Sequence, residues 1–153
     1  MNEPVARAMV EAFYQAYAAR DAAKVAVFLD DDVEWTISGP VDVLPFCGTR
    51  HGKAAVLDMV ERLVPAVFRI FNFVPDAMLV DGDQAATLSR LQARSGDGRV
   101  ISYRLAHFVR FRAGKIVRNI ALIDSFDAVE QVLGHPLDVH ECERREAGDL
   151  IAV

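Results

Sequence analysis

The sequence predicts an α+β fold in which helices cover one face of a curved antiparallel sheet. In the first part of the chain, apolar residues recur at helical spacing. From residue 67 onward, apolar and polar residues alternate instead, which is the pattern of half-buried strands. Short turns that contain glycine separate the alternating runs, as in a meander of hairpins. Helices followed by such a meander indicate an α+β domain.

The composition favours one globular domain over residues 1–153, with its core at about 5–134 and a tail at 139–153. Hydrophobic residues make up 52% of the chain and charged residues 25%, so a sizeable core can form. The net charge of −5 and the lack of a basic stripe argue against nucleic acid or an anionic membrane surface as a partner. Cys47 and Cys142 match no metal-site spacing, and no apolar run is long enough to span a membrane. We therefore expect a cytoplasmic protein without a metal or cofactor.

The N-terminal half predicts three helices and one strand. Pro4 suits the first turn of a helix, and Asp21 is placed to cap a second helix. The acidic run at 30–32 breaks the pattern as a solvated turn, and Pro65 stops the third helix. The predicted ranges are 4–20 and 22–29 for the first two helices, 33–37 for the strand, 41–51 for a loop and 53–64 for the third helix.

The C-terminal half predicts strands joined by tight turns, followed by one short helix. The turns at 81–83 and 95–98 carry the glycine and aspartate residues that hairpin turns prefer. Gly134 and Pro136 close the helix. The predicted strands are 67–74, 77–80, 84–94 and the two runs of a central hairpin at 101–124, and the predicted helix is 125–133.

The central hairpin carries the main functional clue. The core side of its first run is expected to hold Tyr103, Leu105, His107, Val109 and Phe111. After the turn at 112–114, the same alternation places on the core side Ile116, Arg118, Ile120, Leu122 and finally Asp124. Two titratable side chains, His107 and Asp124, are thus expected in largely apolar surroundings.

Asp124 is the first candidate for chemistry. At the end of its strand it is expected at the mouth of a pocket, where apolar walls raise the pKa of a carboxyl group toward values useful for acid/base work. The alternative, which does not exclude the first, is that Asp124 or Ser125 caps the helix at 125–133. His107 is the second candidate: it relays a proton or binds a substrate carbonyl, or else it is a core histidine with a backbone or carboxylate partner.

Aromatic and methionine side chains are candidates for the pocket wall, with ordinary core packing as the alternative. Trp35 is the strongest of them, because its indole N–H needs a partner such as Asp124 or a ligand. The candidate wall residues are Tyr17, Trp35, Phe46, Met59, Phe68, Phe71 and Tyr103.

Several features of the chain occur together in one known family. They are Ala-Arg-Asp at 19–21, FLDDDVEW at 28–35, Gly-Thr-Arg-His-Gly at 48–52, His107, Arg-Ala-Gly-Lys-Ile at 112–116 and the apolar run into Asp124. This pattern resembles the SnoaL-like polyketide cyclases of the nuclear transport factor 2-like superfamily, over about residues 5–134. The resemblance implies a cone-shaped half-barrel that wraps around the first helix and leaves a deep apolar pocket. It also implies dimerisation through the outer face of the sheet.

The resemblance implies roles for particular residues. In SnoaL-like cyclases and limonene epoxide hydrolases, an aspartate at the position of Asp124 is an acid/base group, and a histidine recurs at that of His107 in SnoaL-like sequences. Arg90 matches an arginine of the epoxide hydrolases. The aspartate that follows it there is replaced here by Gln92, which cannot exchange a proton and remains a candidate substrate contact. Epoxide hydrolysis is therefore disfavoured, and Arg90 either pairs with Asp124 or lies at the surface.

Two functional hypotheses follow from these residues. The first is a cofactor-free acid/base enzyme, such as a cyclase, isomerase or hydratase, that acts on an apolar, oxygenated, polyketide-like substrate. In it Asp124 moves the proton, while His107 and Arg90 orient the substrate. The second is a ligand-binding or dimerisation module without catalysis, and the resemblance implies a homodimer in either case. Steroid isomerisation is disfavoured, because the tyrosine and aspartate that ketosteroid isomerases require fall at Phe13 and Ile37.

Overall fold

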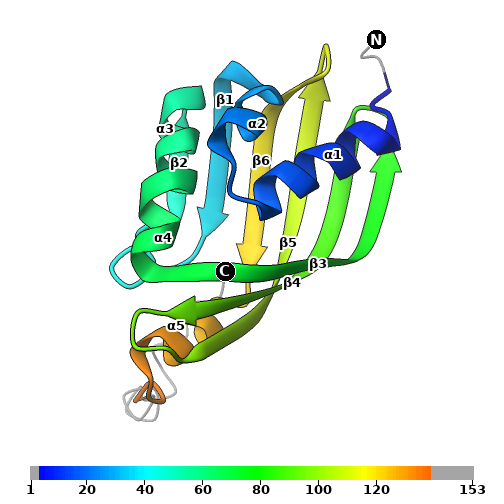
Figure 1. Cartoon of the computed structure of the whole chain (residues 1–153). Helices are drawn as coiled ribbons and strands as arrows, with labels where there is room; N and C mark the ends of the chain where they lie inside the picture. Colours follow the sequence, from blue (N-terminus) through cyan, green and yellow to red (C-terminus); the bar gives the residue numbers. More distant parts are fainter. Residues whose placement is uncertain (1–3, 139–153) are drawn as a thin grey trace, which may run out of the picture.

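One six-stranded sheet forms the body of the protein, and the helices lie against it (Figure 1). The computed structural model describes residues 4–138. The strand order is β2-β1-β6-β5-β4-β3, and neighbours are antiparallel except for β1 and β6, which are parallel. The strands are β1 (Leu29–Ser38), β2 (Gly48–His51), β3 (Phe68–Asp81), β4 (Gln84–Ser95), β5 (Val100–Arg112) and β6 (Lys115–Ile123). The helices are α1 (Arg7–Ala18), α2 (Ala22–Ala26), α3 (Lys53–Asp58), the π-helix η1 (Met59–Leu63), α4 (Val64–Val67) and α5 (Ser125–Leu133).

The curved, unclosed sheet confirms the predicted α+β half-barrel. Figure 1 shows α1 crossing the sheet, with β3 and β4 bending beneath the helix. The largest side chains without solvent contact, led by Trp35, Phe13 and Phe111, fill the space between α1 and the sheet. No helix among residues 4–138 has the length and apolar character needed to cross a membrane. The tail predicted at 139–153, with Cys142, lies outside the described residues.

The first two helices form where helical spacing places them. Arg20 takes the left-handed backbone conformation (φ +54°), which ends the first helical segment. Oδ1 of Asp21 then accepts a hydrogen bond from the backbone N–H of Lys24 (3.1 Å) at the start of α2, so the predicted cap is confirmed. α2 is shorter than predicted because the chain joins the sheet from Leu29 onward.

The acidic run at 30–32 lies within β1, so the predicted solvated turn was wrong. The pairing of β1 with β6 shifts in register between Leu29 and Glu34, and the acidic residues occupy this irregular stretch. Asp31 is exposed there and accepts a hydrogen bond from Nζ of Lys53 (2.6 Å). Charged side chains are tolerated in such a stretch because solvent and a partner charge, rather than the core, surround them.

The third predicted helix continues past Pro65, which was expected to end it. After α3 the chain forms the five-residue π-helix η1 and then a last turn, α4. Pro65 stands in the first turn of α4, a position where the missing N–H and the fixed φ of proline are tolerated. The stop was wrong because the π-helical turn resets the hydrogen-bond ladder just before Pro65.

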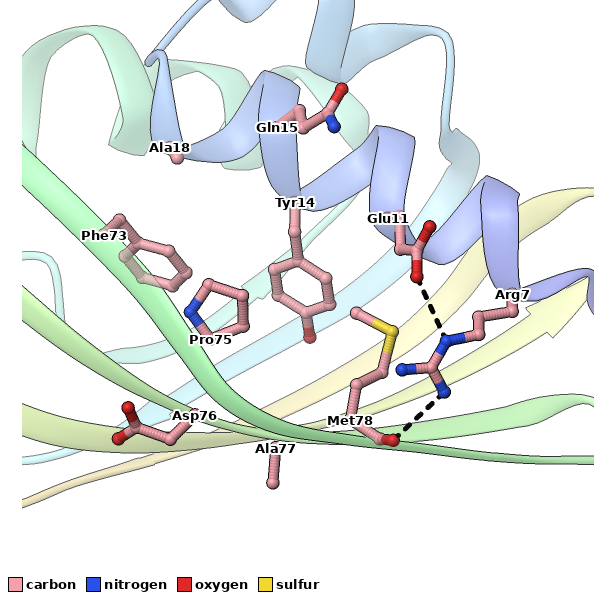
Figure 2. A pocket seen from close by; sticks show the side chains of 10 residues that line it. All are labelled: Arg7, Glu11, Tyr14, Gln15, Ala18, Phe73, Pro75, Asp76, Ala77 and Met78. Atoms are coloured by element: carbon pink, nitrogen blue, oxygen red, sulfur yellow. Dashed lines mark hydrogen bonds and ion pairs between the residues drawn. The ribbon is translucent and has the colours of Figure 1, made fainter.

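β3 is one continuous edge strand rather than the two predicted strands at 67–74 and 77–80. Its pairing with β4 is irregular next to Asn72 and next to Pro75. A proline is compatible with an edge strand because one side of the strand has no partner that needs its N–H. The strand bends in this region and brings Phe73 and Met78 toward α1 (Figure 2).

The core side of β5 is the predicted one, whereas the core side of β6 is not. Ile116 pairs with Phe111, and Arg118 pairs with Arg110, so Val117 is an extra residue on β6. Beyond this bulge the buried positions are Asn119 and Ala121, and the outward ones are Ile120 and Leu122. One extra residue reverses the facing of every side chain that follows it, and sequence alternation cannot show it.

Candidate functional site

The concave side of the sheet encloses a small cavity at the C-terminal end of α1, here called the inner cavity. Its free volume is about 20 Å³, which is room for about one water molecule. Its wall includes four of the predicted wall residues, Tyr17, Phe46, Phe68 and Tyr103, together with His107. The remaining lining residues are Arg20, Ile37, Val64, Ile70, Leu91, Leu105, Ala121 and Ile123.

His107 lies in the centre of β5 with its side chain completely enclosed. Its ring stacks on Tyr14 and Phe73, with centroid distances of 5.6 and 6.4 Å, and meets Tyr17 edge to face at 5.7 Å. Neither ring nitrogen has a hydrogen-bond partner among residues 4–138, so the predicted alternative of a partnered core histidine is not what the structure shows. Burial, and secondly the charge of Arg20, lower the pKa of His107 to about 3. The imidazole is therefore neutral at physiological pH.

Arg20 brings a positive charge to the inner cavity. Its guanidinium carbon lies 4.2 Å from the centroid of the Tyr17 ring, a cation–π arrangement. Nε and Nη1 are buried and have no hydrogen-bond partner in the described part of the chain. The charge of Arg20 acts to lower the pKa of both His107 and Tyr103, and all three residues line the cavity. The sequence did not single out Arg20. In the sequence, the one sign of its role was its position between the end of one predicted helix and the cap of the next, where the backbone has to turn.

The remaining polar groups of the inner cavity are neutral. Burial raises the pKa of Tyr103, with the charge of Arg20 opposing this effect, so its phenol remains protonated and able to donate a hydrogen bond. The lining residues include no aspartate or glutamate. The cavity therefore combines one cation, one neutral imidazole and phenol groups, and the described chain supplies it with no negative charge.

Other buried polar atoms in the described part of the protein also lack partners. Within residues 4–138, Trp35 Nε1, Ser89 Oγ and both side-chain polar atoms of Asn119 are buried without a hydrogen bond. In contrast, Thr87 Oγ1 donates to the hydroxyl of Tyr14 (2.9 Å). Buried polar atoms in folded proteins are nearly always paired, and an exception calls for an explanation such as a bound water or ligand. The interior thus contains hydrogen-bond donors and acceptors that the described part of the folded chain leaves unpaired.

A second hollow, here called the outer groove, lies between α1 and β3 (Figure 2). Its volume is about 410 Å³, and Tyr14, Phe73 and Pro75 form its inner side. Tyr14 stacks on Phe73 at 6.4 Å, and both rings stack on His107 of the inner cavity. One layer of aromatic rings therefore separates the two hollows.

One end of the outer groove is fixed by Arg7. Nε of Arg7 is 3.1 Å from Oε1 of Glu11, and Nη1 donates to the backbone carbonyl of Met78 (3.3 Å), as Figure 2 shows. These contacts tie the start of α1 to β3. The sequence did not predict the groove, because it arises where a bent edge strand passes a helix that is distant in the chain.

Asp124 lies outside both hollows, contrary to the prediction. Its side chain is exposed, because the bulge at Val117 reverses which side chains of β6 point toward the core, so that position 124 points outward. It stands at the N-cap of α5, but its carboxylate makes no capping hydrogen bond. The predicted pocket mouth was therefore wrong, whereas the predicted cap position is confirmed without a side-chain hydrogen bond.

Arg90 and Gln92 also lie away from the cavities. Arg90 is exposed on β4 and stands across from Arg104, and Gln92 Oε1 accepts a hydrogen bond from Nδ2 of Asn72 (2.7 Å). The core side of β4 carries the intervening residues instead, such as Leu91. The set of Arg90, Gln92 and Asp124 suggested by the resemblance is thus not assembled around a cavity.

The other predicted wall residues belong to different surroundings. Trp35 and Met59 are completely buried but do not line the inner cavity, and Phe71 is exposed. Trp35 packs on Tyr17, with ring centroids 5.7 Å apart, and so lies one layer behind the cavity wall. Its indole N–H has no partner within residues 4–138, so it is not bonded to Asp124, whose side chain is exposed.

Three solved structures place this geometry among known proteins. A candidate isomerase from Rhodopseudomonas palustris has a TM-score of 0.73 and 35% identity, over 83% of this chain and 94% of that one. A nuclear transport factor 2-like protein of unknown function from Burkholderia pseudomallei K96243 has a TM-score of 0.72 and 25% identity, over 82% and 95% of the chains. TerC, co-crystallised with polyporic acid, has a TM-score of 0.72 and 21% identity, over 82% and 96% of the chains.

The sequence itself also matches a family. Residues 10–119 match the SnoaL-like domain, which is more than two thirds of the chain. A search of curated proteins gave no match. The family match and the structural neighbours together confirm the resemblance drawn from the sequence. The chain belongs to the SnoaL-like domain family, within the nuclear transport factor 2-like superfamily.

Proposed function

We propose that the protein binds a small, largely apolar and oxygenated molecule of polyketide-like kind, with its polar end in the inner cavity. The observation that carries the proposal is that unpartnered polar atoms of His107 and Arg20 meet at one cavity. Each buried polar group left without a partner costs about 1–3 kcal/mol. A ligand oxygen that accepts from these groups recovers this free energy on binding.

The ligand needs more space than the inner cavity offers when empty. The outer groove of about 410 Å³ has the size of small-molecule sites in proteins, which are roughly 300–1,000 Å³. A rotation of Phe73 away from Tyr14 would join the two hollows, because these rings form the layer between them. The apolar part of the ligand then lies in the outer groove, and its oxygen reaches His107.

Two comparisons support this proposal. TerC has the same fold and was co-crystallised with polyporic acid. The family of this chain and its overall fold are those of small-molecule-binding, isomerase-type proteins. Neither the substrate nor a reaction follows from these likenesses, and the residues around the cavity therefore carry the proposal.

Binding can be tested with neutral two-ring probes, 2-tetralone and 1-naphthol. We expect saturable chemical-shift changes at His107 and the neighbouring aromatic rings, and an increase in the thermal midpoint. His107→Phe keeps the ring but removes both nitrogens, and should weaken binding about 10-fold, the effect of one lost hydrogen bond. The control is His51→Phe, because His51 is exposed on β2. Equal loss in the two variants, or shifts confined to the sheet's outer face, would contradict the proposal.

Isomerase chemistry is the second candidate, favoured by the 35% identity to the candidate isomerase. A neutral imidazole and a guanidinium can stabilise the negative charge that develops on a substrate oxygen during enolisation. The lining residues described include no carboxylate, so a water molecule has to accept the α-proton and pass it to the solvent. The test is exchange of the α-protons of 2-tetralone in heavy water, followed by NMR. Exchange that is faster than in buffer, and that is slowed by His107→Phe but not by His51→Phe, would establish isomerase-type chemistry. Exchange at the buffer rate would exclude this chemistry, and only the binding proposal would remain.

We also propose that two copies associate through the outer face of the sheet. Leu88, Ala106 and Leu122 are cross-strand neighbours there, and Phe108 lies in the adjacent row. Leu88, Phe108 and Leu122 are each between 41% and 51% exposed, so they form a contiguous apolar patch. Such a patch, with the family's implied mode of dimerisation, supports a second copy as its partner.

A further inference from the structure

Arg20 carries two free-energy costs that the fold does not require. Its backbone is left-handed (φ +54°), a conformation that disfavours every residue with a Cβ atom. Its Nε and Nη1 are buried with no hydrogen-bond partner within residues 4–138. A glycine at this position would remove both costs, and the break between α1 and α2 would remain.

Arg50 provides the contrast, because it is a partly buried arginine whose guanidinium is hydrogen-bonded to the fold through both terminal nitrogens. Nη1 of Arg50 donates to the carbonyls of Phe46 (2.8 Å) and Cys47 (3.2 Å), and Nη2 donates to that of Pro45 (2.9 Å). These bonds fix the loop that leads into β2. Arg20 makes no such bonds, so a structural explanation of the same kind is not available to it.

The surroundings of Arg20 are suited to an anion. The apolar wall of the inner cavity lowers the local dielectric constant, which strengthens the attraction between opposite charges. Tyr17 lies under the guanidinium, and Tyr103 and His107 are near enough to be affected by its charge. Protonated Tyr103 and neutral His107 are both hydrogen-bond donors to an oxygen, and the described lining residues provide no competing carboxylate.

We propose that the ligand carries an anionic oxygen, as a carboxylate, phenolate or enolate, which binds to the guanidinium of Arg20. This inference rests on the proposed binding function and adds the charge of the ligand to it. His107 provides the second contact, and the apolar body of the ligand lies in the outer groove against Tyr14, Phe73 and Pro75. An arginine is suited to this task because its planar guanidinium offers several N–H groups to one anion.

The decisive comparison is between 2-naphthoate and 2-naphthamide, which differ in charge but hardly in shape. We expect wild-type protein to bind 2-naphthoate at least 10-fold more tightly in calorimetric titrations at pH 7. Arg20→Gln should remove this preference and Arg20→Lys should keep part of it. Arg90→Gln is the matched control, because Arg90 is exposed on β4 and should leave the preference unchanged.

The possible results separate the two proposals. If wild type binds the acid and the amide with equal affinity, and both change the chemical shifts of His107, the proposal of an anionic ligand is overturned. The proposed binding function then still stands. If Arg20→Gln still prefers the acid, the proposal that the anion binds to Arg20 is also overturned, because another cation would then be responsible. If neither naphthalene compound nor the neutral probes bind wild type, both proposals fail.

Stability offers a second readout that needs no ligand. Arg20→Gly relieves the left-handed strain and removes two buried N–H groups that have no hydrogen-bond partner within residues 4–138, so the thermal midpoint of the free protein should rise by about 2–5 °C. The stabilisation by 2-naphthoate should disappear in the same variant. A lower midpoint would show that Arg20 supports the fold, and would overturn the proposal that it is retained for an anion.

Discussion

The imidazole of His107 lies against the phenol ring of Tyr14, with centroids 5.6 Å apart and planes inclined by 22°. Tyr14 belongs to α1 and also lines the outer groove, whereas His107 belongs to β5 and lines the inner cavity. The two rings are thus the point at which the helix, the sheet and both hollows meet. A change in the protonation or hydrogen bonding of either ring should affect stability and access together.

Stability should fall as the pH decreases because of His107. Burial lowers its pKa from 6.5 to about 3, so the unfolded chain takes up a proton over this range and the folded protein does not. Between these values the free energy of unfolding should fall by about 1 kcal/mol for each pH unit. Urea denaturation at pH 7, 6 and 5 measures this dependence.

His107→Phe is the variant that isolates the effect. It should lose this contribution to the pH dependence, whereas His51→Phe, at an exposed site, should keep it. A pH dependence that is unchanged in His107→Phe would mean that the pKa of this histidine is nearly the same in the folded and the unfolded protein, and that the inner cavity is wetter than its packing indicates.

The hydrogen bond from Thr87 to Tyr14 should stabilise the layer between the hollows. Thr87→Val keeps the shape of the side chain but removes the donor, and we expect a loss of about 1–2 kcal/mol in the free energy of unfolding. Tyr14→Phe should cost a similar amount because Thr87 loses its partner. The double variant should cost less than the sum of the two. Additive losses in urea denaturation would show that the two hydroxyl groups are not coupled.

The facing of β5 and β6 can be tested with two leucines. Leu105→Ala removes a buried side chain and should lower the free energy of unfolding by about 2–4 kcal/mol. Leu122→Ala removes an outward side chain that is 48% exposed, and should cost less than about 1 kcal/mol in the monomer. A larger loss for Leu122 than for Leu105 would mean that the bulge at Val117 is misplaced.

Association through the outer face should depend on Phe108. Phe108→Lys places a charge in the apolar patch, so the proposed dimer should dissociate to a monomer without loss of folding. Light scattering after gel filtration measures the mass. Val27→Lys is the control, since Val27 is equally apolar and exposed but lies outside the sheet. A dimer that persists in Phe108→Lys would exclude this face as its interface.

The sequence predicted the fold better than the site because periodicity reports burial over many residues. Helical spacing located α1, and alternation together with glycine turns located β4, β5 and β6. Asp124 was misplaced because a single extra residue, Val117, reverses the facing that alternation predicts. The same local irregularity explains why Ile120, expected in the core, lies on the outer side.

Arg20 and the outer groove were missed for different reasons. The direction of the Arg20 side chain depends on one left-handed backbone angle, and no pattern in the sequence encodes it. The groove depends on the bend of β3 around Asn72 and Pro75, which brings distant parts of the chain together. His107 was located correctly because its strand is regular, although its lack of a hydrogen-bond partner became visible only with its neighbours in place.

Trp35 is the one tryptophan in the chain, so the intrinsic tryptophan fluorescence of the protein comes from this residue alone. Its indole is fully enclosed and packs on Tyr17, the ring that carries the Arg20 guanidinium on the cavity side. A ligand that draws the Arg20 guanidinium away from Tyr17 changes the electric field at the indole of Trp35, because the indole packs on that same ring. Emission from unlabelled protein therefore reports occupancy directly, with no background from a second fluorophore of the same kind.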